Sequence, residues 1–488
     1  MYIPEPFSRY DDDTLLKTST TAITIKLKTM NITALLNELL SQFPNQLDQS
    51  AHALEQHSSD ESWHSKQPPA AVIYPHSTQD VSDIATLCHR HNVAMSIFGA
   101  GTSVEGQSIP APSSLCIDMS RMNTLLALHA DDQDCIVQAG LTRLELNAQI
   151  KDRGLFFPVD PGANASIGGM CATRASGTNA VKFGTMKHNV LGLTAVTADG
   201  TIIHTGGRAR KSASGYDLTS LLIGSEGTLA IITEVTLRLQ GIPENTAVAT
   251  VQFENLDALT QLVFQVLQIG IPIARVELLD KPAITAVNHY AQLELQENHT
   301  LFFEFHGSLQ SIKEQTDTVE KLSQALGGSQ FSWATKQEDK NRLWKARHNV
   351  LYAAKATLPN STIWTTDVCV PISALPQCIL ETHSDIQTSG LLAPIVGHVG
   401  DGNFHLLIVI PNNDATAQQQ ANSLNEKLIH RALAMGGTCT GEHGIGKGKR
   451  RWLIEEHGNA VDLMKTIKSS LDPKNLLGRG NIFSLEQP

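Results

Sequence analysis

The most informative segment of the chain is Ile97-Phe-Gly-Ala-Gly-Thr-Ser-Val-Glu-Gly106, where a β-type run leads into a loop rich in glycine and hydroxyl side chains. Gly99 and Gly101 have no side chain, so backbone N–H groups can converge there on an anion. Thr102 and Ser103 add hydroxyl donors to the same loop. The segment therefore predicts a cradle for a pyrophosphate, with an ordinary tight turn as the alternative.

Two further loops have the same composition, Asp160-Pro-Gly-Ala-Asn-Ala-Ser-Ile-Gly-Gly169 and Gly224-Ser-Glu-Gly-Thr228. The first loop is neither a Walker sequence nor a G-x-G-x-x-G that leads directly into a helix, so the two commonest nucleotide fingerprints do not apply. Three such loops in one chain are improbable as chance turns, and together they indicate a nucleotide-binding region.

Length and charge limit the classes of protein that remain. The chain has 488 residues, with 37 Lys+Arg against 48 Asp+Glu and a formal net charge of −11. About 150 residues per domain would give roughly three domains. A net negative chain without a broad basic region is a poor ligand for phosphate backbones, so we expect no nucleic-acid partner.

Cysteine content and hydropathy indicate a compartment. Seven cysteines form no C-x-x-C pair, which predicts neither a disulfide framework nor a thiolate zinc site. No apolar stretch is long enough to span a bilayer, and the N-terminal residues do not resemble a signal peptide. We therefore expect a soluble, globular, cytoplasmic protein, with at most peripheral contact to the inner face of a membrane.

The chain divides into four segments by its patterns of strands and helices. Residues 1–65 form an extension with one helix over 32–43, and we expect the first 29 residues not to pack. Residues 66–243 alternate β-type runs with helices and glycine turns. Residues 244–458 predict an antiparallel sheet with helices on one face, and residues 459–488 a helix with an extended end, so the fold class is α+β.

The second region carries Gly397-His-Val-Gly-Asp-Gly-Asn-Phe-His405 and, further on, Gly441-Glu-His-Gly444. Apolar residues flank the Gly-Asp-Gly-Asn turn, so a hairpin would bring His398 and His405 together across two strands. Glu442 would complete a set of two histidines and one carboxylate around a metal that can also bind substrate. The alternative is a pair of surface histidines on a hairpin.

Two more residues are candidates for chemistry. Side chains of neighbouring residues in an extended segment diverge, so His443 would not share the metal with Glu442 and is free to act as a base. Arg347, in Leu343-Trp-Lys-Ala-Arg-His-Asn349, suits a bidentate grip on a carboxylate, although most lone arginines are solvated surface groups.

Several motifs together resemble those of one flavoprotein family. Besides the second and third glycine loops, they are Ala175-Ser-Gly177, Phe183-Gly-Thr-Met186, Ala209-Arg-Lys-Ser212 and Gly215-Tyr-Asp-Leu218. They are similar to motifs of FAD-binding oxidoreductases of the vanillyl-alcohol oxidase (PCMH-type) superfamily. The nearest branch is that of the cytochrome-type D-lactate dehydrogenases, the glycolate oxidase flavoprotein subunits and the D-2-hydroxyglutarate dehydrogenases. The resemblance spans about residues 68–483.

The resemblance implies a two-lobed PCMH-type FAD-binding domain over 66–243 and a ferredoxin-like antiparallel-sheet cap over 244–458. Residues 459–488 would return to the FAD-binding domain. The first loop lacks the histidine to which some relatives attach flavin covalently, so we expect non-covalent FAD. By matching motifs, the residues expected to bind FAD are Gly99, Gly101, Thr102 and Ser103 at the pyrophosphate, Pro161, Gly162, Ser166 and Gly169 along the ribityl and phosphate side, and Glu226 and Ile232 at the adenosine half or lobe interface.

The resemblance also assigns the cap residues. Relatives coordinate zinc or manganese at the positions of His398, His405 and Glu442, and His443 matches the histidine that takes the hydroxyl proton. Arg347 matches the arginine expected to bind the substrate carboxylate, and Asn403 is expected to reach the metal or the substrate.

The function that the resemblance implies is FAD-dependent oxidation of a D-2-hydroxy acid, with D-lactate favoured and with cytochrome c or a quinone as electron acceptor. The alternatives are a glycolate oxidase flavoprotein subunit, a D-2-hydroxyglutarate dehydrogenase and, from another class, a metal-dependent hydrolase without redox chemistry. The sequence departs from the family at Gly478-Arg-Gly-Asn481, where relatives have Asn-Pro-Gly-Lys, and at Phe183, where they have tyrosine.

Overall fold

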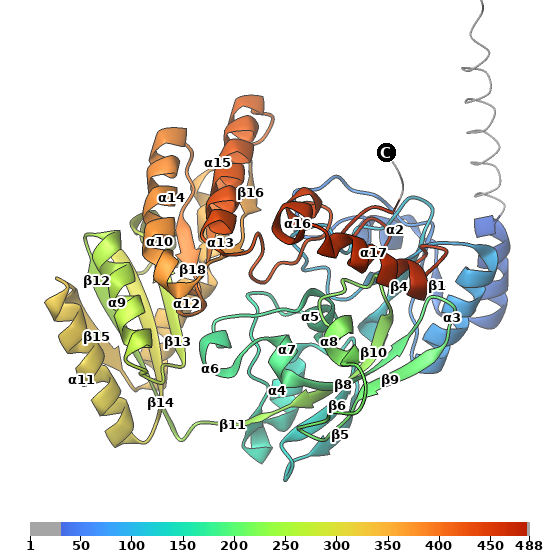
Figure 1. The fold of residues 1–488 in the computed structure, drawn as a ribbon, viewed down its shortest axis with the longest axis horizontal. Helices are drawn as coiled ribbons and strands as arrows, with labels where there is room; N and C mark the ends of the chain where they lie inside the picture. Colours follow the sequence, from blue (N-terminus) through green and yellow to red (C-terminus); the bar gives the residue numbers. More distant parts are fainter. Residues whose placement is uncertain (1–30, 486–488) are drawn as a thin grey trace, which may run out of the picture.

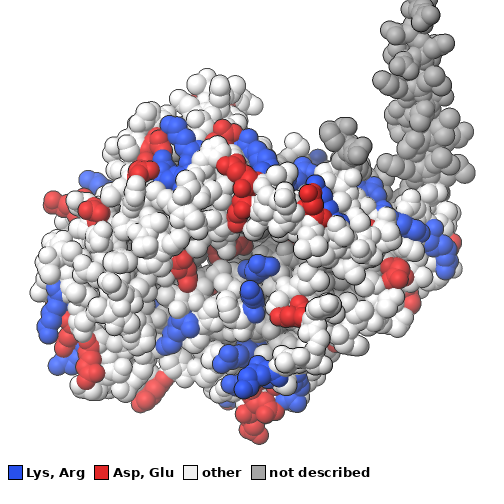
Figure 2. All heavy atoms as spheres, viewed as in Figure 1, with Lys and Arg blue, Asp and Glu red and all other residues white. Residues whose placement is uncertain are grey.

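The computed structural model describes residues 31–485, and our hypothesis about the first 29 residues lies outside this range. Figure 1 shows two large bodies that face each other. The first body is drawn mainly in blue to green, and the second, the cap, mainly in yellow-green to orange. The C-terminal helices lie beside the first body. The face seen in Figure 2 carries acidic and basic side chains interspersed.

The first lobe begins with a helix over residues 31–42 and contains a four-stranded sheet in the order β1-β2-β4-β3. Its central strands run parallel, so the loop that starts at Gly99 leaves the carboxyl end of β3. The elements are β1 (Leu47–Asp48), α2 (Ala51–Gln56), β2 (Ala71–Ile73), α3 (Thr78–His91), β3 (Met95–Phe98), β4 (Leu115–Asp118) and the 3-10 turn η1 (Met119–Arg121).

The second lobe is a five-stranded antiparallel sheet in the order β5-β6-β10-β8-β9. Its strands are β5 (Leu125–His129), β6 (Asp134–Gln138), β8 (Val190–Val196), β9 (Ile202–Gly206) and β10 (Ile231–Arg238). The helices are α4 (Arg143–Ile150), α5 (Ile167–Thr173), α6 (Ala180–Phe183), α7 (Met186–Asn189) and α8 (Leu218–Leu222), with η2 (Lys151–Arg153) and the small pair β7 (Leu155–Phe156) and β11 (Gln240–Gly241). Both lobes share one apolar core.

The cap is built on an eight-stranded sheet in which every pairing is antiparallel. The path is β15-β12-β14-β13-β18-β19-β16, and β17 also pairs with β19. The strands are β12 (Asn245–Phe253), β13 (Arg275–Leu279), β14 (His299–Gly307), β15 (Ser329–Ala334), β16 (Ser361–Thr365), β17 (Val368–Cys369), β18 (Ile395–Gly397) and β19 (Asn403–Pro411).

Our prediction that helices cover one face of this sheet is wrong, because both faces carry a core. Leu406 and Ile408 pack in one cluster with α9 (Leu256–Gln268), α11 (Leu309–Ala325), α14 (Leu375–Ser389) and α15 (Ala415–Ala434). Leu407 and Val409 pack in another with α10 (Lys281–Ala291), α12 (Gln337–His348) and α13 (Val350–Thr357). Alternate residues of a strand point to opposite faces, so a continuous apolar run such as that of β19 indicates burial on both sides. The short turns η3 (Ile372–Ala374) and η4 (Val399–Asp401) complete the cap.

The C-terminal part contains α16 (Arg450–His457) and α17 (Ala460–Leu471). After α17 the chain packs into the core of the first body, where Leu476 and Leu477 are fully buried. The backbone N–H of Met95 in β3 donates to the Leu476 carbonyl at 2.7 Å. None of the helices in the described part of the chain is both long and apolar enough to cross a membrane.

Candidate active site

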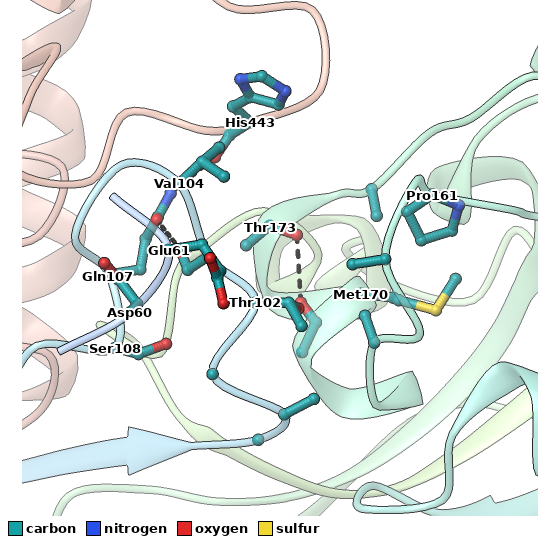
Figure 3. A pocket seen from close by; sticks show the side chains of 18 of the residues that line it. Asp60, Glu61, Thr102, Val104, Gln107, Ser108, Pro161, Met170, Thr173 and His443 are labelled. Atoms are coloured by element: carbon teal, nitrogen blue, oxygen red, sulfur yellow. Dashed lines mark hydrogen bonds between the residues drawn. The ribbon is translucent and has the colours of Figure 1, made fainter. Parts of the chain in front are cut away.

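A cavity of about 640 Å³ lies between the two lobes and the cap. In Figure 3, Thr102 of the first glycine loop lies on one side of the cavity with Gln107 and Ser108, which follow that loop, and Pro161 and Met170 lie on the other. The residues predicted to bind FAD all line this cavity: Gly99, Gly101, Thr102, Ser103, Pro161, Gly162, Ser166, Gly169, Glu226 and Ile232. The predicted cap residues Arg347, His398, His405, Glu442 and His443 line it as well.

The glycine loops come so close together that a side chain would interfere. A Cβ atom at Gly99 would lie 2.4 Å from the Ser166 hydroxyl oxygen, which accepts the N–H of Gly169 at 3.3 Å. Gly101 has a φ of +68°, a conformation that side chains disfavour. A narrow, glycine-lined cradle with hydroxyl donors at Thr102 and Ser103 fits the pyrophosphate of a dinucleotide.

The strands β18 and β19 bring the two predicted histidine ligands together. His398 follows β18 and His405 lies within β19, and Val396 pairs with His405 across the two strands. The Nδ1 atom of His398 lies 2.8 Å from Glu277 Oε1, and that of His405 lies 3.0 Å from the carbonyl oxygen of Thr366. These acceptors favour the tautomer with the proton on Nδ1, which leaves the Nε2 lone pair available for a metal.

Glu442 faces both of these lone pairs. Its Oε1 lies 3.3 Å from Nε2 of His398 and 3.3 Å from Nε2 of His405. Its Oε2 is buried and has no hydrogen-bond partner among residues 31–485. A buried carboxylate oxygen without a partner beside two imidazole lone pairs fits a divalent cation such as zinc or manganese.

The charges of this cluster are coupled. Burial alone would lower the pKa of His398, but the carboxylates of Glu277 and Glu442 outweigh it and raise that pKa well above its ordinary value. Burial alone would raise the pKa of Glu442, but His398 and His405 hold it well below its ordinary value. Without a cation, a proton on imidazole therefore balances the negative charge of the buried carboxylates. A bound cation can replace that proton as the balancing positive charge.

His443 lies next to the cluster. Its ring stacks on that of His405 with centroids 5.0 Å apart and an interplanar angle of 14°, and its Nε2 lies 3.9 Å from Glu442 Oε1. Burial lowers the pKa of His443 to about 4, so the imidazole is neutral at pH 7 and able to accept a proton. Its buried Nδ1 has no hydrogen-bond partner in the described part of the chain.

Arg347 reaches the cavity from α12 and is held by a carboxylate that the sequence analysis did not single out. Its Nε donates to Glu277 Oε2 at 2.6 Å, while Glu277 Oε1 contacts His398. Glu277 is fully buried in β13 and links the two predicted site residues. The sequence signal for Glu277 as the support of Arg347 and His398 is a carboxylate that stands among the apolar residues of β13.

Asn403, predicted to reach the metal or the substrate, is held by hydrogen bonds within the cap. It is absent from the cavity lining, and its side-chain amide donates to Asp367 Oδ1 and to the Val368 carbonyl, both at 2.7 Å. The side chain of Asn403 therefore ties β19 to residues 367 and 368 at the start of β17. The role of Asn403 at the metal or the substrate remains a prediction.

The fold defines the class of the protein. Among solved structures, 4-ethylphenol oxidase from Gulosibacter chungangensis superimposes with a TM-score of 0.75, covering 94% of this chain and 98% of that one at 16% identity. p-Cresol methylhydroxylase superimposes with a TM-score of 0.73, covering 93% and 98% at 14% identity. The predicted α+β fold with a PCMH-type FAD-binding domain and an antiparallel-sheet cap is confirmed.

Sequence comparison then defines the family. The family described as "FAD binding domain" matches residues 69–206, and that described as "FAD linked oxidases, C-terminal domain" matches residues 242–482. A probable mitochondrial D-lactate dehydrogenase from Danio rerio is 50% identical over 89% of this chain and 88% of its own length. The mitochondrial D-lactate dehydrogenase [cytochrome] of Arabidopsis thaliana is 44% identical over 85% of this chain and 73% of its own. The chain belongs to the FAD-linked oxidases.

These relatives bear on the predicted cofactor and on the predicted location. FAD is the cofactor, and membership in an FAD-linked family favours redox chemistry over the metal-dependent hydrolase. The predicted cytoplasmic location is wrong, because the relatives from Danio rerio and Arabidopsis thaliana are named as mitochondrial proteins. Composition alone could not distinguish these compartments.

Proposed function

We propose that the protein oxidises a D-2-hydroxy acid, D-lactate to pyruvate, with FAD. The observation that carries this proposal is the position of Arg347, Glu442 and His443 on the cap wall of the cavity whose opposite wall is made of the glycine loops. The names of the relatives from Danio rerio and Arabidopsis thaliana support the substrate.

The residues act on different atoms of the substrate. Arg347, with its Nε bound to Glu277, presents the rest of its guanidinium to the carboxylate of the 2-hydroxy acid. His443 takes the hydroxyl proton while the C2–H bond breaks and the C2–O double bond forms. Bound FAD supplies the acceptor of the two electrons and the hydrogen that leave C2.

His398, His405 and Glu442 would hold one divalent cation. Bound there, the cation would supply positive charge beside the hydroxyl oxygen and would make its proton easier to remove. Glu277 and the Thr366 carbonyl, which hold the two histidine rings, keep the Nε2 atoms turned toward the site. The unpartnered Oε2 of Glu442 supports this proposal.

For the electrons that leave the flavin we propose a cytochrome as acceptor, in keeping with the name of the relative from Arabidopsis thaliana, with a quinone as the alternative.

Glycolate is a second candidate substrate, and the name of one relative supports it. A glycolate oxidase subunit of Bacillus subtilis is 30% identical over 85% of this chain and 89% of its own length.

A panel of substrates tests the proposed function. We expect D-lactate to bleach the flavin absorbance of the anaerobic protein, with L-lactate at least roughly tenfold slower because only one enantiomer can present its C2–H while the carboxylate and hydroxyl are held. Glycolate and D-2-hydroxyglutarate are measured in parallel, and the reduced protein is then mixed with oxygen, a quinone or cytochrome c. A flavin that D-lactate leaves oxidised would contradict the proposal, and faster bleaching by glycolate would favour the alternative.

The exchange of Arg347 for lysine tests the carboxylate grip. Lysine keeps the charge but loses the planar donors that bind two oxygens and the Nε contact to Glu277. We expect Arg347→Lys to raise KM for D-lactate by about tenfold, in keeping with the loss of one charge-assisted hydrogen bond, while FAD remains bound. Arg90→Lys, on the exposed end of α3, is the matched control. An unchanged KM in Arg347→Lys would show that another group binds the carboxylate.

A further inference from the structure

Glu442 and His443 lie on a segment without helix or strand, residues 440–447, that runs between the cap and the FAD-binding lobes. A loop is a weak support for two groups that must keep a fixed distance to His398 and His405. The side chains that hold this segment therefore determine the geometry of the site.

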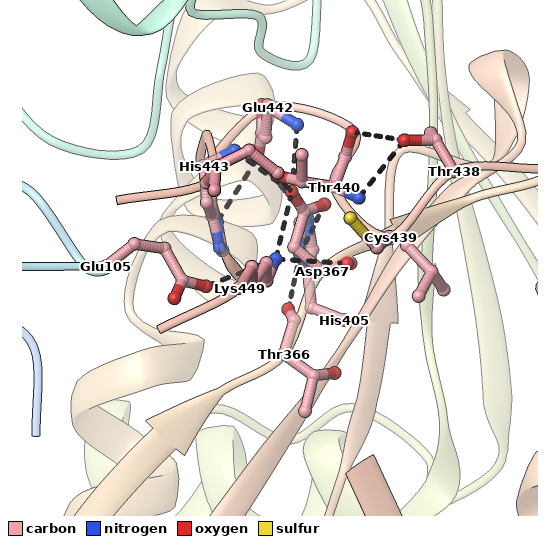
Figure 4. A network of polar contacts seen from close by, with 12 residues as sticks. Glu105, Thr366, Asp367, His405, Thr438, Cys439, Thr440, Glu442, His443 and Lys449 are labelled. Atoms are coloured by element: carbon pink, nitrogen blue, oxygen red, sulfur yellow. Dashed lines mark hydrogen bonds and ion pairs between the residues drawn. The ribbon is translucent and has the colours of Figure 1, made fainter. Parts of the chain in front are cut away.

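The cap holds the segment through Asp367, which is fully buried (Figure 4). Asp367 Oδ2 accepts the backbone N–H groups of Glu442 and His443, both at 2.9 Å, and the hydroxyl of Thr440 at 2.7 Å. Its Oδ1 accepts the Asn403 amide. One carboxylate thus fixes the backbone of both functional residues from one side.

The FAD-binding lobes hold the same segment from the other side. Glu226 Oε1 accepts the N–H of Ile445 at 2.6 Å, and Glu226 Oε2 accepts the N–H of Gly446 at 2.8 Å. Gln107, which directly follows the first glycine loop, donates its Nε2–H to the carbonyl oxygen of His443 at 2.7 Å.

The contacts of Glu226 differ from those expected of a cofactor ligand. Its side chain lines the cavity, but both carboxylate oxygens are engaged by the segment, and its backbone has a φ of +51° in the loop between α8 and β10. We propose that Glu226 is the positioning residue by which the FAD-binding lobes set the place of Glu442 and His443. The consequences for catalysis rest on the proposed function.

Gly444 shows how closely the segment fits Glu226. Its φ is +80°, and a Cβ atom there would lie 2.6 Å from Glu226 Oε1 and 2.8 Å from Gln107 Nε2. Only glycine at position 444 lets the chain pass from His443 to the N–H groups of Ile445 and Gly446, which Glu226 binds. Asn481 donates its side-chain amide to the carbonyl oxygens of Gln107 and Glu226, at 3.0 and 3.3 Å, and so joins the two loops that hold the segment.

Glu226→Gln tests the proposal with almost no change in size. An amide has one acceptor oxygen, so one of the two N–H groups would face an NH₂ group and the segment would move away. We expect the Mn²⁺ dissociation constant of the FAD-loaded protein, measured without substrate, to rise about tenfold, as is common when a group behind a metal ligand is lost. We expect the rate of anaerobic flavin reduction by D-lactate to fall by about 10–100-fold with KM little changed, because His443 is displaced.

Glu234→Gln is the matched control, since Glu234 lies in β10 of the same lobe and its carboxylate binds the hydroxyls of Thr78 and Thr194. We expect this variant to keep the Mn²⁺ affinity and the reduction rate of the unaltered protein within twofold. Glu226→Gln values within twofold of this control would overturn the proposal.

Gln107→Met carries the test if Glu226→Gln does not retain FAD. It removes the contact to the His443 carbonyl without changing charge, and we expect smaller shifts in the same direction. Loss of FAD from both variants would also overturn the proposal, because the side chains would then serve the cofactor. Since Mn²⁺ binding needs no substrate, the proposal can be tested even if D-lactate fails to reduce the unaltered protein.

Discussion

We expect His443→Ala to slow anaerobic flavin reduction by D-lactate by about 10²–10⁴-fold, the usual contribution of a positioned general base. Burial holds the pKa of His443 near 4, so the ring is neutral at pH 7 and can take the hydroxyl proton without first losing one. The neighbouring rings of His398 and His405 have their Nε2 atoms 3.3 Å from Glu442 Oε1, whereas Nε2 of His443 lies 3.9 Å from that atom. The reduction rate is measured by stopped-flow absorbance of the flavin.

The same variant should keep its cofactor. His443 contributes its ring to the cap wall, and the glycine loops that fit the pyrophosphate do not depend on that ring. We therefore expect the FAD content of His443→Ala, and its reduction by dithionite, to equal those of His52→Ala, a variant at an exposed histidine of α2. Reduction by D-lactate as fast as in His52→Ala would remove His443 from the mechanism.

The parts of the site that the sequence predicted are those in which local pattern sets spatial proximity. The shared composition of the three glycine loops predicts one nucleotide-binding region, and all three loops line the same cavity. The distance between His398 and His405 follows from one hairpin, because a short turn between two apolar strands leaves few alternative pairings. The domain boundaries at 65, 243 and 458 remain predictions.

The supports of the site could not be predicted in the same way. Glu277 binds His398, and Asp367 binds the backbone of Glu442, across 121 and 75 positions of sequence. Such contacts depend on strand order in the cap, which periodicity does not reveal. The prediction of helices on one face of the cap sheet rests on the order of strands and helices, and that order does not show that a strand such as β19 is buried on both sides.

Asn403 and Asn481 show that a motif does not predict the hydrogen-bond partners of its residues. The family resemblance predicts Asn403 at the metal or the substrate, and its side-chain amide donates to Asp367 Oδ1. At the departure Gly478-Arg-Gly-Asn481, Asn481 lines the cavity and donates to the carbonyl oxygens of Gln107 and Glu226. Membership in a motif fixed the neighbourhood of each residue but not its partner.

Removal of the cation should slow flavin reduction by D-lactate as much as removal of one of its ligands does. The effects of the two changes on this rate should not add. His405→Ala deletes one of the two imidazoles whose Nε2 lies 3.3 Å from Glu442, so the remaining pair of ligands should bind a cation at least about 10-fold more weakly. We expect flavin reduction by D-lactate to fall by a similar factor in His405→Ala and in the unaltered protein after prolonged chelation, because both lack the charge beside the hydroxyl oxygen.

A chelator added to His405→Ala should therefore change little, since residues that act as one unit lose their effect together. In His52→Ala it should slow reduction by D-lactate by the same factor as in the unaltered protein, and added Zn²⁺ or Mn²⁺ should restore the rate there but not in His405→Ala. The measurements are metal content by mass spectrometry and the rate of flavin reduction. Because His405 lies in the buried strand β19, FAD content and the thermal unfolding midpoint are compared with those of His52→Ala, so that loss of fold is recognised. A chain that holds no metal as purified and turns over D-lactate at full rate in chelator would show that Glu442, His398 and His405 are only a buried hydrogen-bonded cluster.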